Sequence, residues 1–194
     1  MILRKFGIQL HSLEHKDIQL TRTWRNADFV RKNMIFDREI TSEMQEVWYN
    51  NLQKTDVYLV INHQSSQIGV IHVKNIDWHT RTGEAGIFIG EQEYLNSYIP
   101  MLAVICLMDV FFNEFSFNGL KAKVKKGNKE ALDFNYSLGY SLVHEAEEHY
   151  LLGVTNESYA TARTNLSKVL NSFNKEIVNH TFTPEEKNYF FLRK

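Results

Sequence analysis

The chain has 194 residues, and its 22 Lys and Arg against 23 Asp and Glu give a formal net charge of −1. Hydrophobic residues make up 43% of the chain, enough to bury a sizeable core, which excludes a disordered protein. The near-zero charge argues against nonspecific nucleic-acid binding, which requires a basic surface to neutralise phosphates.

A single cysteine, Cys106, excludes an intrachain disulfide and a thiolate metal cluster, and favours a reducing compartment. The first 17 residues carry charges that a signal peptide would not tolerate. No apolar run approaches the roughly 18 residues of a membrane span. We therefore expect a cytoplasmic protein with no membrane segment.

The first half of the chain predicts two helices followed by a sheet. Residues 8–13 alternate like an edge strand, and residues 16–26 then follow a helical pattern. Thr41 and the two residues after it form a plausible cap for a second helix over residues 41–53. Three β-rich runs at residues 56–61, 67–76 and 83–90 are separated by short polar turns, which predicts an antiparallel meander.

The second half alternates helices with strands. Residues 100–115 form a strongly apolar helix with Pro100 in its first turn, where a missing N–H costs little. A strand at residues 120–126, a helix over residues 128–140 closed by Gly139, and one or two strands over residues 141–155 follow. Beyond residue 156 we expect a helix, with a second helical piece after Pro184. This order predicts an α+β domain over residues 1–155 and a C-terminal helical extension over residues 156–194.

Three motifs within this pattern resemble the GNAT superfamily of N-acetyltransferases. They are WRN at residues 24–26 followed by Val30-Arg31, GEAGIFIG at residues 83–90, and Asn128-x-x-Ala131 followed by Leu138-Gly139-Tyr140. The nearer likeness is to the branch that contains ribosomal-protein N-terminal acetyltransferases and amino-sugar acetyltransferases of the pseudaminic-acid pathway. The resemblance covers about residues 3–155 and is carried by the combination of motifs.

The resemblance implies a GNAT-like fold, a mixed and mostly antiparallel twisted sheet flanked by helices. It also implies a bacterial-type enzyme that uses acetyl-CoA as a co-substrate and no metal. The acceptor would be a small primary amine, with a nucleotide-linked amino sugar as first choice and a protein or peptide N-terminus as second. Transfer would be direct within a ternary complex. The alternative is a non-catalytic member of the fold that uses its cleft or its tail for binding.

In the family, the pantetheine arm of the donor pairs with a strand that corresponds here to Ile87, Phe88 and Ile89, and Asn128 belongs to a second donor-binding motif. The pyrophosphate lies on the turn before the next helix, where glycines let the backbone approach it. This chain has no glycine between Gly90 and Gly119. Asn96, Tyr98 and Pro100 stand at the expected glycine positions. Either the phosphates bind N–H groups near Asn96, Ser97 and Tyr98, or the donor site is weakened.

Glu84 matches a glutamate of that branch and is the candidate general base, acting through a water on the substrate ammonium. The alternative is a salt-bridged strand residue. Relatives place a tyrosine that protonates the leaving thiolate at the position of Asn135. Tyr136 is its neighbour, but a one-residue shift turns a helical side chain by about 100°. Asn135 and Tyr136 are therefore both candidates near the thioester.

The first-helix residues Trp24, Arg25 and Asn26 correspond to the acceptor pocket of relatives. Arg25 and Arg31 suit a phosphorylated acceptor, although ordinary surface salt bridges would also explain them. Further candidate acceptor contacts are His72, Asp77 and Trp78. A satisfied core histidine and a solvated turn are the alternatives for these positions.

Other chemistries are less well supported. The histidines of HEAEEH, His144 and His149, are five residues apart instead of the four of a zinc motif. Cys106 lies in an apolar segment and is expected to be buried and inert. The tail residues Tyr189, Phe190, Phe191 and Leu192 need a cover, either the domain itself or a second subunit of a homodimer.

Overall fold

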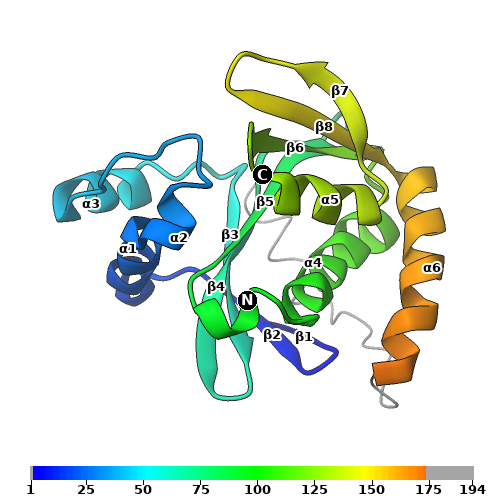
Figure 1. Cartoon of the computed structure of the whole chain (residues 1–194), viewed down its shortest axis with the longest axis horizontal. Coiled ribbons are helices and arrows are strands. Elements are labelled where there is room, and N and C mark those ends of the chain that lie inside the picture. Colours follow the sequence, from blue (N-terminus) through cyan, green and yellow to red (C-terminus); the bar gives the residue numbers. More distant parts are fainter. Residues whose placement is uncertain (1, 174–194) are drawn as a thin grey trace.

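The computed structural model describes residues 2–173 and contains one eight-stranded sheet (Figure 1). Its strands are β1 (Ile2–Lys5), β2 (Ile8–Ser12), β3 (Val57–His63), β4 (Ser66–Asp77), β5 (Thr82–Ile89), β6 (Gly119–Lys125), β7 (Ser141–Glu145) and β8 (His149–Thr155). Their order in the sheet is β1-β2-β3-β4-β5-β6-β8-β7. Every neighbouring pair is antiparallel except β5 and β6, which run parallel. The predicted mixed, mostly antiparallel α+β fold is confirmed.

Helices cover the sheet on both sides. They are α1 (Ile18–Asn26), α2 (Asp28–Arg31), α3 (Ser42–Asn50), α4 (Ile99–Asp109), α5 (Lys129–Ser137) and α6 (Asn156–Phe173), with short helical turns η1 (His15–Asp17), η2 (Gln92–Tyr94) and η3 (Val110–Glu114). In Figure 1, α1 to α3 gather on the left, α4 and α5 lie to the right of centre, and α6 stands at the right-hand end. Two helices begin as expected. Thr41 Oγ1 caps α3 by accepting the Met44 N–H, and Pro100 lies in the first turn of α4.

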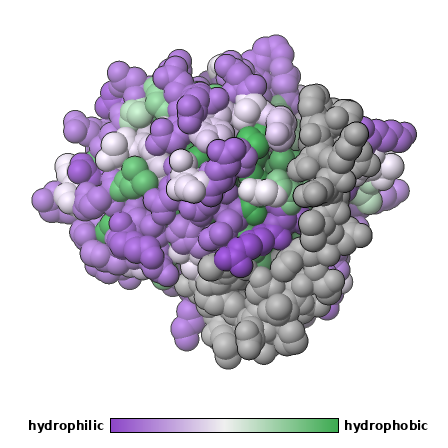
Figure 2. Space-filling view, turned by 90° about the horizontal axis from the view of Figure 1, so that it is seen from below, coloured by the Kyte–Doolittle hydropathy of each residue, from purple (hydrophilic) through white to green (hydrophobic). Residues whose placement is uncertain are grey.

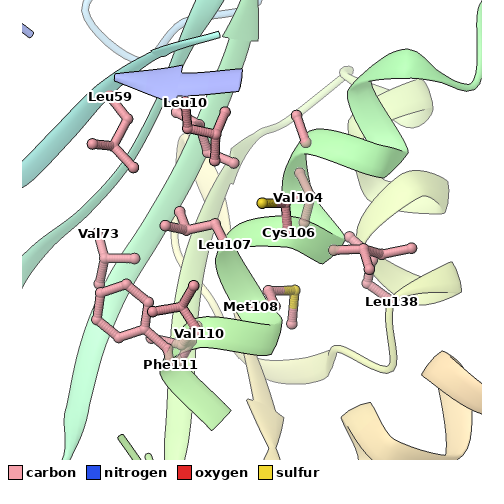
Figure 3. Close-up of a cluster of buried hydrophobic side chains, with 14 of the residues drawn as sticks. Leu10, Leu59, Val73, Val104, Cys106, Leu107, Met108, Val110, Phe111 and Leu138 are labelled. Carbon is pink, nitrogen blue, oxygen red and sulfur yellow. The ribbon is translucent and has the colours of Figure 1, made fainter. Parts of the chain in front are cut away.

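The core lies between α4 and one face of the sheet. Strand side chains alternate between faces, so Leu59 and Val73 point towards α4 and η3, where Leu107 and Phe111 meet them (Figure 3). Almost every residue of α4 is buried, which explains its uniformly apolar sequence. Cys106 is among them and is fully buried, as expected.

The predicted edge strand is an interior strand. Residues 2–5 form β1, which pairs with β2 and covers the edge we assigned to residues 8–13. The connection is a two-residue turn in which Phe6 and Gly7 both have positive φ, 57° and 75°. Such turns match the twist of a hairpin but usually carry Asn-Gly or Asp-Gly. Because phenylalanine is not a usual residue for this turn, the sequence did not predict the hairpin.

Helix α6 is attached to α4 through a buried carboxylate. Asp109 accepts the Tyr159 hydroxyl at 2.6 Å, and it forms ion pairs with Lys5 at 2.7 Å and with Arg163 at 3.2 Å. Phe112 stacks on the Tyr159 ring with centroids 5.0 Å apart. The N-terminal hairpin and the predicted C-terminal extension are thereby held to one point on α4.

The remaining sequence expectations concern metal binding, membrane segments and the C-terminal tail. HEAEEH spans the β7–β8 hairpin turn, and residues 2–173 contain no group of three acidic, histidine or cysteine side chains placed to hold a metal. Within the same residues, no helix has the length and hydrophobicity to cross a membrane.

The face drawn in Figure 2 is mainly polar wherever it is coloured, with hydrophobic residues in small patches. The helical piece after Pro184, the aromatic run at Tyr189 to Leu192 and the homodimer predicted from it lie outside the described residues.

Candidate active site

The two parallel strands at the centre of the sheet separate along their length. Residues Thr82, Gly83 and Glu84 of β5 pair with Gly119, Leu120 and Lys121 of β6. Strand β5 continues to Ile89 and β6 to Lys125 without further pairing between them. The result is a wedge between the second halves of β5 and β6, whose β5 side presents backbone groups that no strand satisfies.

The strand register identifies which backbone groups face the wedge. The Gly90 N–H donates to the Ile68 carbonyl at 2.8 Å, which fixes the alternation of hydrogen bonds along the β4–β5 ladder. In an antiparallel ladder every second residue bonds the partner strand and the residues between point away. Phe88 is therefore bonded towards β4, whereas the N–H groups of Ile87 and Ile89 point into the wedge. Of the three donor-binding residues predicted on this strand, Ile87 and Ile89 therefore have backbone N–H groups that a ligand in the wedge can reach.

The turn between β5 and α4 uses most of its own donors. The N–H groups of Leu95 and Ser97 donate to the carbonyls of Gln92 and Tyr94, both at 3.2 Å. The Ile99 N–H donates to Ser97 Oγ at 3.2 Å, and Pro100 has no N–H. Among Ile99, Pro100 and Met101 in the first turn of α4, only Met101 therefore has an N–H that these hydrogen bonds do not use. The glycine replacements predicted from the sequence thus coincide with a turn in which the N–H groups of Leu95, Ser97 and Ile99 are bonded internally.

On the face of the sheet opposite α4, an aromatic pair lies beside the wedge. His72 on β4 stacks on Tyr58 of β3, with centroids 4.8 Å apart, and Trp48 of α3 meets Tyr58 edge-on. Burial lowers the pKa of His72 to about 3, so its ring is neutral at pH 7. Burial, with the charges of Asp56 and Glu84, raises the pKa of Tyr58 to about 12. Neither side chain is an effective base at neutral pH.

Arg25 of α1 reaches over this face and lacks an acidic partner. Its guanidinium carbon lies 5.7 Å from the centre of the Phe88 ring, and Nη2 donates to the Phe36 carbonyl at 3.3 Å. Nη1 is buried and has no hydrogen-bond partner, and within residues 2–173 no carboxylate forms an ion pair with Arg25. Burial lowers the pKa of Arg25, although a guanidinium stays charged at pH 7. A buried cation with an unused donor is suited to a ligand anion.

Glu84 lies on β5 at the vertex of the wedge and is held by two cations. Lys74 on β4 and Lys123 on β6 both approach its carboxylate to 3.0 Å. Partial burial raises the pKa of Glu84, but the hydrogen bonds and charges of Lys123 and Lys74 outweigh it and leave the pKa below its ordinary value. The carboxylate is therefore ionised at neutral pH and able to accept a proton, although as a weakened base.

Two of the predicted acceptor residues have structural partners. Trp24 is only 4% exposed, its Nε1 donates to Glu91 at 2.9 Å, and its ring occupies the space where a Cβ of Gly90 would lie. The Asn26 amide exchanges two hydrogen bonds of 2.8 Å with the backbone of Ile40. Burial removes Trp24 from any open acceptor surface. Of the WRN motif, Arg25 is the residue that the structure brings to the Tyr58–His72 face.

Asp77 and Trp78 lie at the other end of β5 from the wedge. Asp77 accepts the N–H groups of His79 and Thr80 and so shapes the β4–β5 turn, while Trp78 packs edge-on against Phe115 and Phe117. Thr82, which pairs with Asp77, is five residues from Ile87, a separation of about 16 Å along a strand. The structure therefore does not bring these two residues to the opening, because the meander places its turn at the closed end.

The α5 residues divide into inward and outward positions. Asn128 caps the helix by accepting the Ala131 N–H at 3.0 Å. Asn135 shares a helix face with Ala131 and Leu138, and its amide donates to the Ala131 carbonyl at 2.7 Å. The Tyr136 side chain is 43% exposed and points away from that face. Between the two thiolate candidates, Asn135 is the one directed inwards.

Sequence reasoning did not identify Tyr58, Lys74 or Lys123, which complete this face. Each lies on a strand that the sequence predicted, and alternation placed each of them opposite the buried residues. The missing information was the register, which sets Tyr58 against His72 and Lys74 against Glu84.

Comparison with known proteins gives a consistent family match. Residues 8–141 match the family model described as the acetyltransferase (GNAT) domain. No curated protein matches the chain. One similar solved structure is a domain from Methanocaldococcus jannaschii, with 19% identity and a TM-score of 0.70, covering 78% of this chain and 99% of that chain. A second is the Vibrio cholerae spermidine N-acetyltransferase in complex with CoA and spermine, with 16% identity and a TM-score of 0.69, covering 79% of this chain and 98% of that chain. A third is apo FdhC, described as a nucleotide-linked sugar GNAT, with 18% identity and a TM-score of 0.70, covering 87% of this chain and 97% of that chain. At these identities the structures establish the likeness of fold.

Proposed function

Because this chain belongs to the acetyltransferase (GNAT) domain family, we propose that it is an N-acetyltransferase that moves the acetyl group of acetyl-CoA directly to a small primary amine. The wedge between β5 and β6 carries this proposal. A pantetheine arm has amide groups that can pair with a free strand edge, and the N–H groups of Ile87 and Ile89 supply that edge. The same N–H groups can polarise the thioester carbonyl as the amine attacks.

Glu84 is the residue proposed to receive the ammonium proton through a water molecule. It lies at the vertex of the wedge, and Lys74 and Lys123 keep it ionised. Asn135 is proposed to hydrogen-bond the leaving thiolate from α5, because it faces inwards and Tyr136 does not. No acyl-enzyme is required in this scheme.

The acceptor proposed first is an amino sugar linked to a nucleotide. Arg25 supports it, because its buried Nη1 has no partner and a phosphate would provide one. Arg25, Lys74 and Lys123 also outnumber Glu84 on this face, which disfavours a polycation such as spermidine. A protein or peptide N-terminus is the second candidate acceptor. We also propose that the reaction takes place in the cytoplasm.

The closed β5–α4 turn favours one competing function, a non-catalytic protein that keeps the fold and binds a ligand in the cleft. Thermal unfolding with acetyl-CoA and desulfo-CoA separates the two. A ligand at a hundred times its Kd adds about 2.7 kcal/mol of stability. A rise in Tm with either compound, followed by acetylation of a nucleotide-linked amino sugar, is the expected result. An unchanged Tm at millimolar concentrations of both would exclude the enzyme.

A further inference from the structure

We propose that this protein recognises its thioester donor by the pantetheine arm alone, so that the adenosine 3′,5′-bisphosphate half of CoA contributes little to binding. This inference rests on the proposed function and concerns the same wedge. It follows from three features of the donor side: the hydrogen bonds of the β5–α4 turn, the charges around that turn, and the pairing of the lysines across the wedge.

The turn has few backbone donors to give to a diphosphate. A phosphate at a helix N-terminus is bound by converging N–H groups of the preceding loop and the first helical turn. Here Leu95 and Ser97 donate to carbonyls of the turn itself, and the Ile99 N–H is capped by Ser97 Oγ. Pro100 removes a further donor. A diphosphate could use the N–H groups of Leu95, Ser97 and Ile99 only by breaking these hydrogen bonds.

The charges around the turn also oppose a phosphate. Residues 82–118, which include all of β5, the turn and α4, contain no Lys or Arg. A cavity of about 560 Å³ near the start of the turn is lined by Leu20, Ser65, Ser66, Gln67, Glu91 and Glu93. Glu91 accepts one hydrogen bond from Trp24 and has no cation beside it among the ion pairs of residues 2–173. Two carboxylates thus flank the first residues of the turn.

Four lysines, Lys32, Lys125, Lys126 and Lys129, line a cavity on the other side of the wedge, around the β6–α5 turn. Three of these four have a carboxylate partner. Lys125 pairs with Asp37 and Lys126 with Glu145, each at 2.7 Å, and Lys129 pairs with Asp133. A diphosphate there would compete with carboxylates. The β5 edge, by contrast, is free at Ile87 and Ile89, and it fits the amide-bearing pantetheine arm.

Calorimetric titration of the full chain with CoA, pantetheine and adenosine 3′,5′-bisphosphate tests the inference without any acceptor. We expect the Kd of pantetheine to lie within tenfold of that of CoA, and the bisphosphate to show no saturable binding at 1 mM. CoA binding more than tenfold tighter than pantetheine, or displacement of CoA by the bisphosphate, would overturn the inference and leave the proposed function intact. Absence of binding by both CoA and pantetheine would instead overturn the proposed function.

A variant with a reopened turn provides a second measurement. The triple substitution Asn96→Gly, Tyr98→Gly and Pro100→Ala restores the flexibility and the missing N–H. We expect it to tighten CoA at least fivefold and to leave the Kd of pantetheine unchanged. Glu157→Gln in the first turn of α6 changes one charge elsewhere and serves as the control, with no effect on either ligand. A triple variant that folds, by circular dichroism, and tightens neither ligand or both equally would contradict the inference, while the wild-type titrations stand even if the variant does not fold.

Discussion

Gly86 lies directly opposite His72 in the β4–β5 ladder, and a Cβ at Gly86 would come within 2.5 Å of His72 Cε1. The absent side chain gives the imidazole the space in which it stacks on Tyr58. A glycine in the GEAGIFIG segment therefore shapes the face beside the wedge. It does so from the neighbouring strand and without any requirement for positive φ.

The first prediction concerns this close approach. Gly86→Ala should lower the free energy of unfolding by about 1–3 kcal/mol, because the ring must move in a packed environment. Urea denaturation measures the change. Gly153→Ala is the control, since its Cβ would meet only the exposed Val143 side chain, and it should cost less. Adding His72→Ala should recover part of the Gly86→Ala loss, and a purely additive double variant would show that His72 is not the obstacle.

The second prediction is a pH dependence of stability that originates at His72. Its pKa is about 3 in the folded protein and about 6.5 when unfolded. Below pH 6.5 the unfolded chain binds the proton more readily, so the free energy of unfolding falls towards pH 3, by up to about 1.4 kcal/mol per pH unit. Above pH 7 the group has no effect. Urea denaturation between pH 7.5 and 4.5 should show a shallower slope for His72→Gln, and equal slopes would contradict the assignment.

The third prediction concerns acceptor binding by Arg25. Arg25→Gln should raise the KM for an amino sugar linked to a nucleoside diphosphate by about 10- to 100-fold, the range expected for a lost hydrogen bond to a charged group. The KM for the free amino sugar should stay the same. Arg31→Gln is the matched control, because Arg31 is already paired with Asp28 at 2.7 Å. Equal losses for both acceptors would remove Arg25 as the phosphate contact.

The fourth prediction concerns Glu84 as base. Glu84→Gln should lower kcat by about 10²- to 10⁴-fold, with the Kd of CoA unchanged. Lys123→Met tests the same group without removing it. Because Lys123 lowers the pKa of Glu84, its loss should raise that pKa and move the acidic limb of the kcat/KM profile to higher pH. Full activity of Glu84→Gln would exclude the role, as would an acidic limb that does not respond to Lys123→Met.

The fifth prediction concerns the buried Asp109. Asp109→Asn leaves Lys5 and Arg163 without their counter-ion, at 14% and 21% side-chain exposure. Removing one partner of a buried ion pair costs about 3–5 kcal/mol. Asp133→Asn breaks the exposed pair with Lys129 on α5 and should cost under about 0.5 kcal/mol. Similar losses of Tm in the two variants would mean that Asp109 does not anchor α6 and the N-terminal hairpin.

Much of the fold was predictable because its signals are local. The meander of β3, β4 and β5 follows from alternation in three short runs, and α4 follows from Pro100 and a long apolar segment. The β1–β2 hairpin was missed, because Phe6 at positive φ is not a turn signal that sequence statistics favour. The departure of the β5–α4 turn at Asn96, Tyr98 and Pro100 was visible in the sequence, since glycine and proline constrain the backbone wherever they occur.

The sequence by itself determined the class of fold, the family motifs and the absence of glycines from the donor turn, because periodicity and backbone restrictions act between near neighbours along the chain. Only the tertiary structure decided that Glu84 is held by Lys74 and Lys123, that Trp24 is buried against Gly90, and that Arg25 has an unpartnered Nη1. These relationships join residues from different elements. They depend on strand register and on how α1 packs against the sheet, and such long-range packing leaves no periodic trace in the sequence.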